Sequence, residues 1–116
     1  MNDSLQVLAR ELDRFAQDRD WKQFHSPKNL ASALIVEAGE LLEHFQWMTD
    51  AQSRELAPEQ REIVGAEIAD VLLYLIQLAD ALGIDPVATA RAKLQVNASK
   101  YPVESARGSS KKYDKL

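Results

Sequence analysis

The sequence contains no cysteine. This absence excludes disulfide bonds, thiolate metal sites and thiol catalysis, so a metal bound by this chain must have oxygen or imidazole ligands. The sequence also lacks an internal repeat and any convincing strand pattern. Its 116 residues are expected to form one domain around a single core.

Apolar runs long enough to cross a membrane are missing as well. The longest runs are interrupted by Asp70 and Gln77, well short of the ~20 residues that a spanning helix needs. The start, MNDSLQVLARELD, carries acidic residues where a secretory signal has a basic end and a long apolar centre. We therefore expect a cytoplasmic protein without membrane contact.

Basic residues are too few for a general binder of nucleic-acid polymers. The formal net charge is −4, whereas proteins that bind nucleic acid usually present a basic face. A small anionic substrate would therefore be recruited by a metal and a few local cations.

Helical spacing of apolar residues and helix-boundary signals predict an all-α protein. Asp3 or Ser4 is available as the first N-cap. A cap followed by proline occurs at residues 26–27 and again at 85–86, and Gly83 is positioned to end a helix. Short loops between the elements predict a four-helix bundle. The predicted helices span residues 4–18, 26–48, 58–82 and 86–100.

The last residues of the chain differ in composition from the rest. Pro102 disfavours helix at Tyr101, and the residues after it are polar and contain glycine and serine. We expect residues 1–102 to form the folded domain and residues 103–116 to form a flexible tail.

The predicted third helix carries a single polar strip. From Ile63 to Ala79 almost every residue is apolar or small, so this helix should be buried nearly all round. So large an apolar surface also predicts self-association. At about 100° per residue, the polar side chains of this helix share an arc of roughly 80°. They are Glu67, Asp70, Tyr74 and Gln77.

The predicted second helix also turns carboxylates toward a core. Glu37 and Glu40 border its apolar face and are three residues apart. Glu67 and Asp70 have the same spacing, which puts both carboxylates of a pair on one side of their helix. Two such helices side by side would gather four acids, whose repulsion a divalent cation removes. Oxygen ligands favour magnesium or manganese.

Two alternatives to this metal site are open. In the first, Glu37 or Glu67 is merely a buried acid that is satisfied by lysine, arginine or tyrosine. A di-iron bundle also uses inward-facing acids, but it pairs them with Glu-x-x-His motifs. Here Glu40 is followed at that spacing by Glu43, and Glu67 by Asp70, which disfavours the di-iron interpretation.

Aromatic residues accompany the acids in the sequence. Trp47 follows Glu40 by two predicted helical turns, and Tyr74 follows Asp70 by one. Aromatic faces beside metal-binding acids suit a nucleotide, whose base stacks while its phosphates meet the metal. A role for Trp47 at a protein interface stays open. The loop at residues 20–26, DWKQFHS, adds three rings that either cap the core or bind a ligand.

These motifs resemble a known family. ExxE in VEAGELLEHFQW, followed by ExxD in EIADVLLYL, is similar to the all-α nucleotide pyrophosphohydrolases of the MazG-like superfamily. DWKQFHSPKNL before the first motif, FQW after it and NASKYP near the end resemble the single-domain dCTP pyrophosphatase branch. The resemblance covers roughly Leu12 to Pro102.

The resemblance implies a magnesium-dependent enzyme, with manganese as the alternative ion. It would cleave a nucleoside triphosphate between the α- and β-phosphates, and its substrate would be dCTP or a modified pyrimidine deoxynucleotide. The implied cellular role is nucleotide-pool cleaning, and the implied assembly is a homodimer or homotetramer. We expect Glu40 to orient or deprotonate the attacking water as well.

Individual residues take roles from this resemblance. The implied metal ligands are Glu37, Glu40, Glu67 and Asp70. The implied substrate-binding residues are Trp21, His25, Trp47, Tyr74, Lys93, Asn97, Lys100 and Tyr101, with the two lysines near the phosphates. The rival hypothesis is a non-catalytic helical module that oligomerises or binds a nucleotide or partner protein. Such a module has no need for four mutually repelling acids, which argues against it.

Overall fold

The computed structural model describes residues 4–116, and this part of the chain contains helices and no strands. The all-α fold class predicted from the sequence is therefore confirmed. The four long helices are α1 (Leu5–Asp18), α2 (Pro27–Glu43), α4 (Pro58–Ala81) and α5 (Pro86–Lys100). The short elements are the 3₁₀ turn η1 (Lys22–Phe24), α3 (Asp50–Ser53), α6 (Val103–Ala106) and the 3₁₀ turn η2 (Tyr113–Lys115).

The chain divides into two compact units, with the boundary between Ile84 and Asp85. The first unit contains α1 to α4, and the second contains α5, α6 and η2. Within the second unit the ring of Tyr113 packs edge-on against Tyr101, with 6.1 Å between centroids. The predicted boundary at residue 102, between a folded domain and a flexible tail, stays a prediction.

Helix starts follow the capping signals of the sequence. Ser4 caps α1, because its Oγ accepts a hydrogen bond from the N–H of Val7 at 3.1 Å. Asp3, the alternative cap, lies outside the described residues. Ser26 caps α2 in the same way, accepting from the N–H of Asn29 at 3.2 Å. These bonds satisfy backbone donors that the first helical turn leaves unpaired.

The end of α4 is also the one that its glycine predicts. Gly83 has φ of 67°, a left-handed conformation that glycine adopts without a steric penalty. The N–H of Ile84 then reaches back to the carbonyl of Ala79 at 2.8 Å, which closes the helix. Asp85 starts α5 immediately afterwards, and its Oδ1 accepts from backbone N–H groups of the first turn.

α2 ends at Glu43, which is earlier than the predicted end near Met48. The N–H of Phe45 donates to the carbonyl of Leu42 at 2.9 Å, so the backbone has changed to the tighter spacing of a 3₁₀ turn. Trp47 therefore lies in turns that follow the helix. The expected position of the Trp47 indole, two helical turns after Glu40 on the same side of the helix, is therefore wrong, because the helix ends before Trp47.

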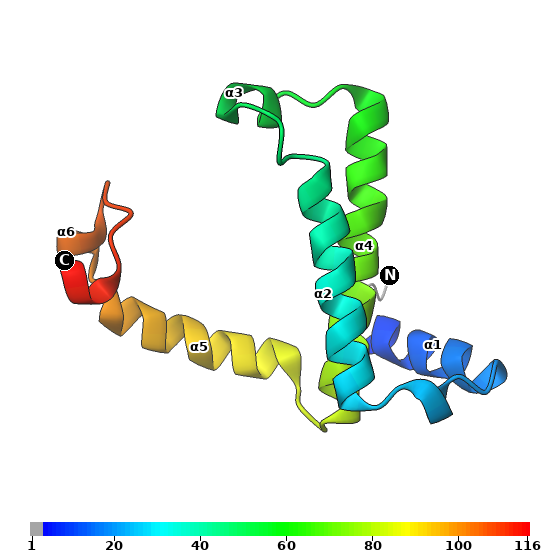
Figure 1. Cartoon of the computed structure of the whole chain (residues 1–116). Coiled ribbons are helices and arrows are strands. Elements are labelled where there is room, and N and C mark those ends of the chain that lie inside the picture. The colour runs from blue at the N-terminus through cyan, green and yellow to red at the C-terminus, as the bar shows by residue number, and fades with distance from the viewer. Residues whose placement is uncertain (1–3) are drawn as a thin grey trace. The chain divides into compact units, whose positions relative to one another are not determined.

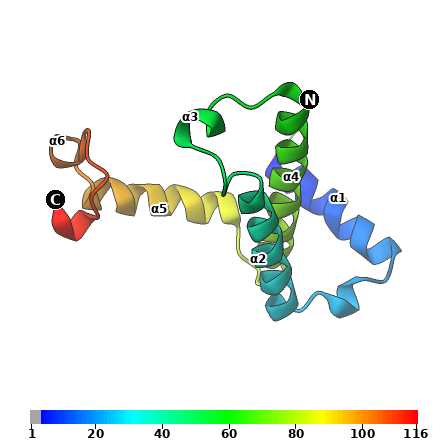
Figure 2. The same ribbon diagram turned by 45° about the horizontal axis from the view of Figure 1, so that its top comes forward.

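The core of the first unit forms where α1 and α2 pack against α4. Figure 1 shows α2 lying along α4, and the turned view in Figure 2 shows the same pairing. The buried apolar residues are Ala16, Leu30, Val64, Ile76 and Ala79.

α4 is not buried nearly all round, contrary to the expectation from its sequence. Ile63 and Ile68 are each 53% exposed, and Leu75 is 45% exposed. The reason is geometric, because α1 and α2 cover only part of the circumference of α4 within this unit.

No single helix among residues 4–116 is long and apolar enough to cross a membrane. The consecutive helices α4 and α5 meet the criteria of length and composition only when the two are taken together.

Candidate metal centre and nucleotide site

Three carboxylates from two helices meet where α2 lies along α4. One oxygen each of Glu37, Glu67 and Asp70 lies within 4.8 Å of the other two, and we call these residues the acidic cluster. α2 supplies the first carboxylate and α4 supplies the others. The spacing of three residues along α4 puts its two acids on the side that faces α2. The two motifs predicted that four acids converge, and three of them do so in the fold.

Two oxygens of the acidic cluster are buried without a hydrogen bond. They are Oε2 of Glu37 and Oε2 of Glu67, neither of which has a partner among the described residues. A buried carboxylate oxygen without a donor is unfavourable unless a cation compensates its charge. Oxygen donors converging from two helices are ligands of the kind that a hard divalent cation takes. The residues present therefore fit a magnesium or manganese ion.

Glu40 contacts the acidic cluster through Glu37. Removal from water and, next in size, the neighbouring carboxylate of Glu40 together raise the pKa of Glu37 to about 7. Glu67 and Asp70 contribute in the same direction. A carboxylate surrounded by other carboxylates resists ionisation because its negative charge would add to theirs. A bound cation would favour the ionised form.

His44 also approaches the acidic cluster, and the sequence interpretation missed it. Its Nε2 lies 4.0 Å from Oε1 of Glu67. The Glu-x-x-His motif has its histidine three residues after the acid, whereas His44 follows Glu40 by four. A spacing of four residues also places two side chains on the same side of a helix. This spacing from Glu40 is the sequence signal by which His44 could have been predicted.

Trp21 and His25 flank the short turn that follows α1. Asp20 has φ of 54°, and this left-handed residue turns the chain out of the helix. The ring of Trp21 then packs edge-on against Phe15, with 5.7 Å between centroids. His25 is half-buried and lines a pocket formed with α1, α2 and α4. The contact of Trp21 with Phe15 supports the packing interpretation of this loop, and its role in ligand binding stays a prediction.

The remaining predicted substrate-binding residues lie on several elements. Trp47 is 88% exposed in the turns after α2, and Tyr74 is half-buried on α4. In the second unit, Tyr101 is half-buried, while the other three are exposed on α5. These three are Lys93, Asn97 and Lys100. The roles of all these residues stay predictions.

The fold and the acidic cluster define an all-α protein with a candidate metal centre built from oxygen ligands. The chain belongs to the MazG-like family, whose sequence pattern matches residues 33–116.

Individual proteins of known name are also similar to this chain. Human dCTP pyrophosphatase 1 is 41% identical over 115 residues, which cover 97% of this chain and 68% of the human protein. The protein of the same name from Rattus norvegicus is 42% identical with the same coverage. A crystal structure of a pyrophosphatase from Archaeoglobus fulgidus matches with a TM-score of 0.79 and 39% identity. That match covers 84% of this chain and 91% of the archaeal chain. The resemblance drawn from the motifs is confirmed.

Proposed function

We propose that this chain hydrolyses dCTP, or a modified pyrimidine deoxynucleotide, to the monophosphate and pyrophosphate with the help of magnesium. Its family and its identity to dCTP pyrophosphatases make it a nucleoside triphosphate pyrophosphohydrolase. The magnesium dependence, the roles of single residues and a cytoplasmic role in nucleotide-pool cleaning are parts of the proposal. The rival hypothesis of a non-catalytic module finds no support in relatives that are named as enzymes.

The observation that carries the metal part of the proposal is the convergence of carboxylate oxygens within 4.8 Å. The proposed ligands are Glu37, Glu40, Glu67 and Asp70. When bound, a divalent cation supplies neutralisation of phosphate charge and activation of water. The two buried oxygens that lack hydrogen bonds support this assignment, because they are unfavourable without a positive partner.

Glu40 is the proposed general base. It is half-buried and adjoins Glu37, so it is close to the proposed ligands without belonging to the three that converge most tightly. In the proposed step the water oxygen bonds to the α-phosphorus and Glu40 accepts the proton of that water. The bond from the α-phosphorus to the bridging oxygen breaks, and pyrophosphate leaves with its electron pair.

The proposed nucleotide contacts divide by chemistry. Aromatic faces stack on a base with little selectivity, amides read its edge, and lysines attract phosphates. Trp21, His25, Trp47, Tyr74 and Tyr101 are proposed for the base and sugar, Asn97 for the base edge, and Lys93 and Lys100 for the phosphates.

A homodimer or homotetramer is proposed for the assembly. Ile35 and Val36 on α2 are 69% and 57% exposed, and Ile63 and Ile68 on α4 are each 53% exposed. Large apolar side chains exposed on neighbouring helices are typical of protein interfaces. Light scattering after size exclusion should give a mass of two or four chains, and a monomer at micromolar concentration would contradict this part.

A panel of nucleoside triphosphates with magnesium tests the chemistry. Pyrophosphate and orthophosphate are measured separately, and we expect pyrophosphate, with dCTP as the best substrate. Glu40→Gln should retain the parent's circular dichroism yet lose about 10²- to 10⁴-fold in kcat, the range that general bases contribute. Glu43→Gln, an exposed neighbour on α2, is the matched control and should keep full activity. Orthophosphate as the product, or an active Glu40→Gln variant, would contradict the proposal.

A further inference from the structure

The chain after α5 folds back toward the C-terminal end of that helix. α5 ends at Lys100, and Pro102 precedes the short helix α6. Gly108 has φ of 73°, a left-handed conformation that glycine adopts without a steric penalty, and the N–H of Ser109 donates to the carbonyl of Ala106 across this turn at 3.0 Å. The 3₁₀ turn η2 then begins at Tyr113. Figure 1 shows α6 and the end of the chain gathered beside the end of α5.

The ring of Tyr113 makes two contacts at this end of the helix. It lies perpendicular to the ring of Tyr101, with 6.1 Å between centroids and 85° between planes. Nζ of Lys100 lies over the ring of Tyr113, 4.7 Å from its centroid. Aromatic pairs attract at about 4.5–7 Å between centroids, and a cation attracts a ring within about 6 Å. Two adjacent residues at the end of α5 thus share one aromatic partner from the end of the chain.

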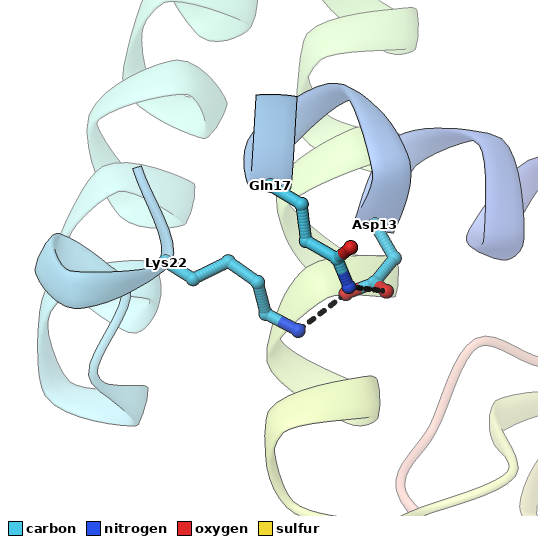
Figure 3. Close-up of polar contacts among 3 residues, drawn as sticks. All are labelled: Asp13, Gln17 and Lys22. Carbon is cyan, nitrogen blue, oxygen red and sulfur yellow. Dashed lines mark hydrogen bonds and ion pairs between the residues drawn. The ribbon is translucent and has the colours of Figure 1, made fainter. Parts of the chain in front are cut away.

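The positive charge of Lys100 stays available in this contact. A carboxylate partner would cancel it, as at Lys22, whose Nζ donates a hydrogen bond to Asp13 (Figure 3). An aromatic ring carries no net charge and attracts the ammonium through its quadrupole. Neither ion pair among residues 4–116 includes Lys100. Its ammonium therefore keeps its full charge for an anion while the ring restricts its position.

Such a restriction has a large effect on a lysine. The ammonium lies at the end of a flexible four-carbon stem, and holding this stem in one conformation has one of the largest entropy costs of any side chain. Lys100 is exposed at the last residue of α5, so burial does not restrict it. A ring that holds the ammonium before an anion arrives removes part of this cost from the binding step.

We propose that Tyr113 is a positioning residue, whose ring holds the ammonium of Lys100 in place for the phosphates of the nucleotide. The inference rests on the proposed function, in which Lys100 attracts those phosphates, and it extends the site to the end of the chain. Tyr101 supports the ring of Tyr113 from the end of α5. This role requires an ordered tail, whereas the composition of residues 103–116 predicts a flexible one.

Nuclear magnetic resonance tests the contact without any turnover. In the full chain labelled with ¹³C at the ε-carbon of lysine, the ring current of Tyr113 should move the Lys100 signal upfield of the other lysine signals. Lys100→Arg removes this signal and so assigns it. Tyr113→Ala should return the signal to the ordinary position, whereas Tyr113→Phe, which keeps the ring, should not. Val103→Ala is the control and should leave the signal unchanged, since Val103 is 74% exposed on α6.

Kinetics with dCTP and magnesium test the role of the contact. Tyr113→Ala should lower kcat/KM about two- to fivefold, which corresponds to the ~0.5–1 kcal/mol of a cation–π contact at an exposed site. The loss should appear in KM with kcat nearly unchanged, because the phosphates are charged both before and during the reaction. A residue that only stabilised the fold would instead lower kcat, since less enzyme would be folded. Tyr113→Phe should retain most of the parent's kcat/KM, and Val103→Ala should match the parent.

A double-mutant cycle shows whether Tyr113 acts through Lys100. In the Lys100→Met background the ammonium that the ring holds is already absent. Tyr113→Ala should therefore have little further effect on kcat/KM there, although it lowers kcat/KM in the parent. Equal losses in the two backgrounds would mean that the ring acts by another route.

The inference is overturned if the Lys100 signal of the parent lies among the other lysine signals, and this result needs no variant to fold. It is also overturned by equal losses in the two backgrounds, or by a loss confined to kcat. Failure of the proposed function looks different, because the parent would then release no pyrophosphate from any triphosphate. In that case, titration of pyrophosphate with magnesium, followed at the Lys100 signal, would still decide the role of Tyr113. Binding about two- to fivefold weaker in Tyr113→Ala would support this role, and equal binding would refute it.

Discussion

The affinity of the acidic cluster for a divalent cation should depend on pH in a range set by Glu37. Removal from water and the surrounding carboxylates raise its pKa to about 7, from an ordinary value of 4.5. A ligand carboxylate must be ionised to bind the cation, so protons and the metal compete for it. With a pKa of about 7, about a tenth of Glu37 is ionised at pH 6 and about nine-tenths at pH 8. The apparent Kd should therefore be about tenfold weaker at pH 6 than at pH 8, and nearly constant above pH 8.

Isothermal titration of magnesium or manganese at pH 6, 7 and 8 measures this dependence. Titrations at pH 7 in two buffers with different ionisation enthalpies should report release of about half a proton per cation bound, because Glu37 is about half-protonated there. Glu37→Gln should bind the cation more weakly and remove the dependence between pH 6 and 8. Glu43→Gln, whose side chain is exposed on the same helix, should behave as the parent.

The same shift predicts the pH dependence of stability without metal. The folded-state pKa of Glu37 lies above its unfolded value, so the folded chain binds this proton more tightly. The stabilisation is complete below about pH 4.5 and is lost as the pH rises through about 7. This group should therefore lower the melting temperature of the metal-free protein between pH 5 and pH 8, and saturating metal should reverse the trend. A cation affinity equal at pH 6 and 8, or an unchanged pH profile in Glu37→Gln, would refute the reasoning.

Three further outcomes are expected. Magnesium or manganese at about 100 times its Kd should add roughly 2.7 kcal/mol to the free energy of unfolding, seen as a higher melting temperature, and Asp70→Asn should reduce this response. His44→Leu should weaken metal binding about tenfold, as loss of polar groups around metal ligands commonly does, because the Nε2 of His44 lies 4.0 Å from Oε1 of Glu67; His44→Gln, which keeps a polar side chain, should retain most of the affinity, and equal effects of the two would contradict a polar role for this residue. Trp47→Ala should weaken the binding of all accepted nucleotides about tenfold with the base ranking kept, consistent with stacking, and Asn97→Ala should narrow the gap in kcat/KM between dCTP and dATP; an unchanged kcat/KM in both variants would contradict their proposed roles in nucleotide binding.

Most of the helices could be predicted because their signals are local. Serine before proline at residues 26–27 and the left-handed Gly83 set boundaries through the backbone groups of one turn, and these boundaries are present in the fold. The end of α2 could not be predicted in this way. Between Glu43 and Met48 there is no glycine or proline, and the apolar spacing continues through Phe45. The change to 3₁₀ hydrogen bonds therefore has no local sequence signal.

The acidic cluster could be predicted because it depends on two simple facts. Spacing of three residues fixes each pair on one side of a helix, and consecutive long helices of a small bundle pack as antiparallel neighbours, here across the connection at residues 44–57. The pocket that His25 lines required more, since one of its walls is α1. Leu12 and Ala16 reach this pocket through the packing of α1 against α4, a contact far apart in sequence that no periodicity specifies. His25 was predicted for the nucleotide site, whereas Gln77, which lines the same pocket, was predicted only as part of the polar strip of α4.

α4 carries a single polar strip on an otherwise apolar helix. Its polar strip presents Glu67 and Asp70 at one place and Gln77 nearly two turns later, while the other sides of the helix are apolar. Because one helix carries both groups, its backbone hydrogen bonds fix the distance and the angle between the acids and Gln77. One residue inserted between Asp70 and Gln77 would turn the amide by about 100° away from the strip. The separation between the acids of α4 and Gln77 is therefore a property of helical register, and it is preserved as long as α4 remains an uninterrupted helix.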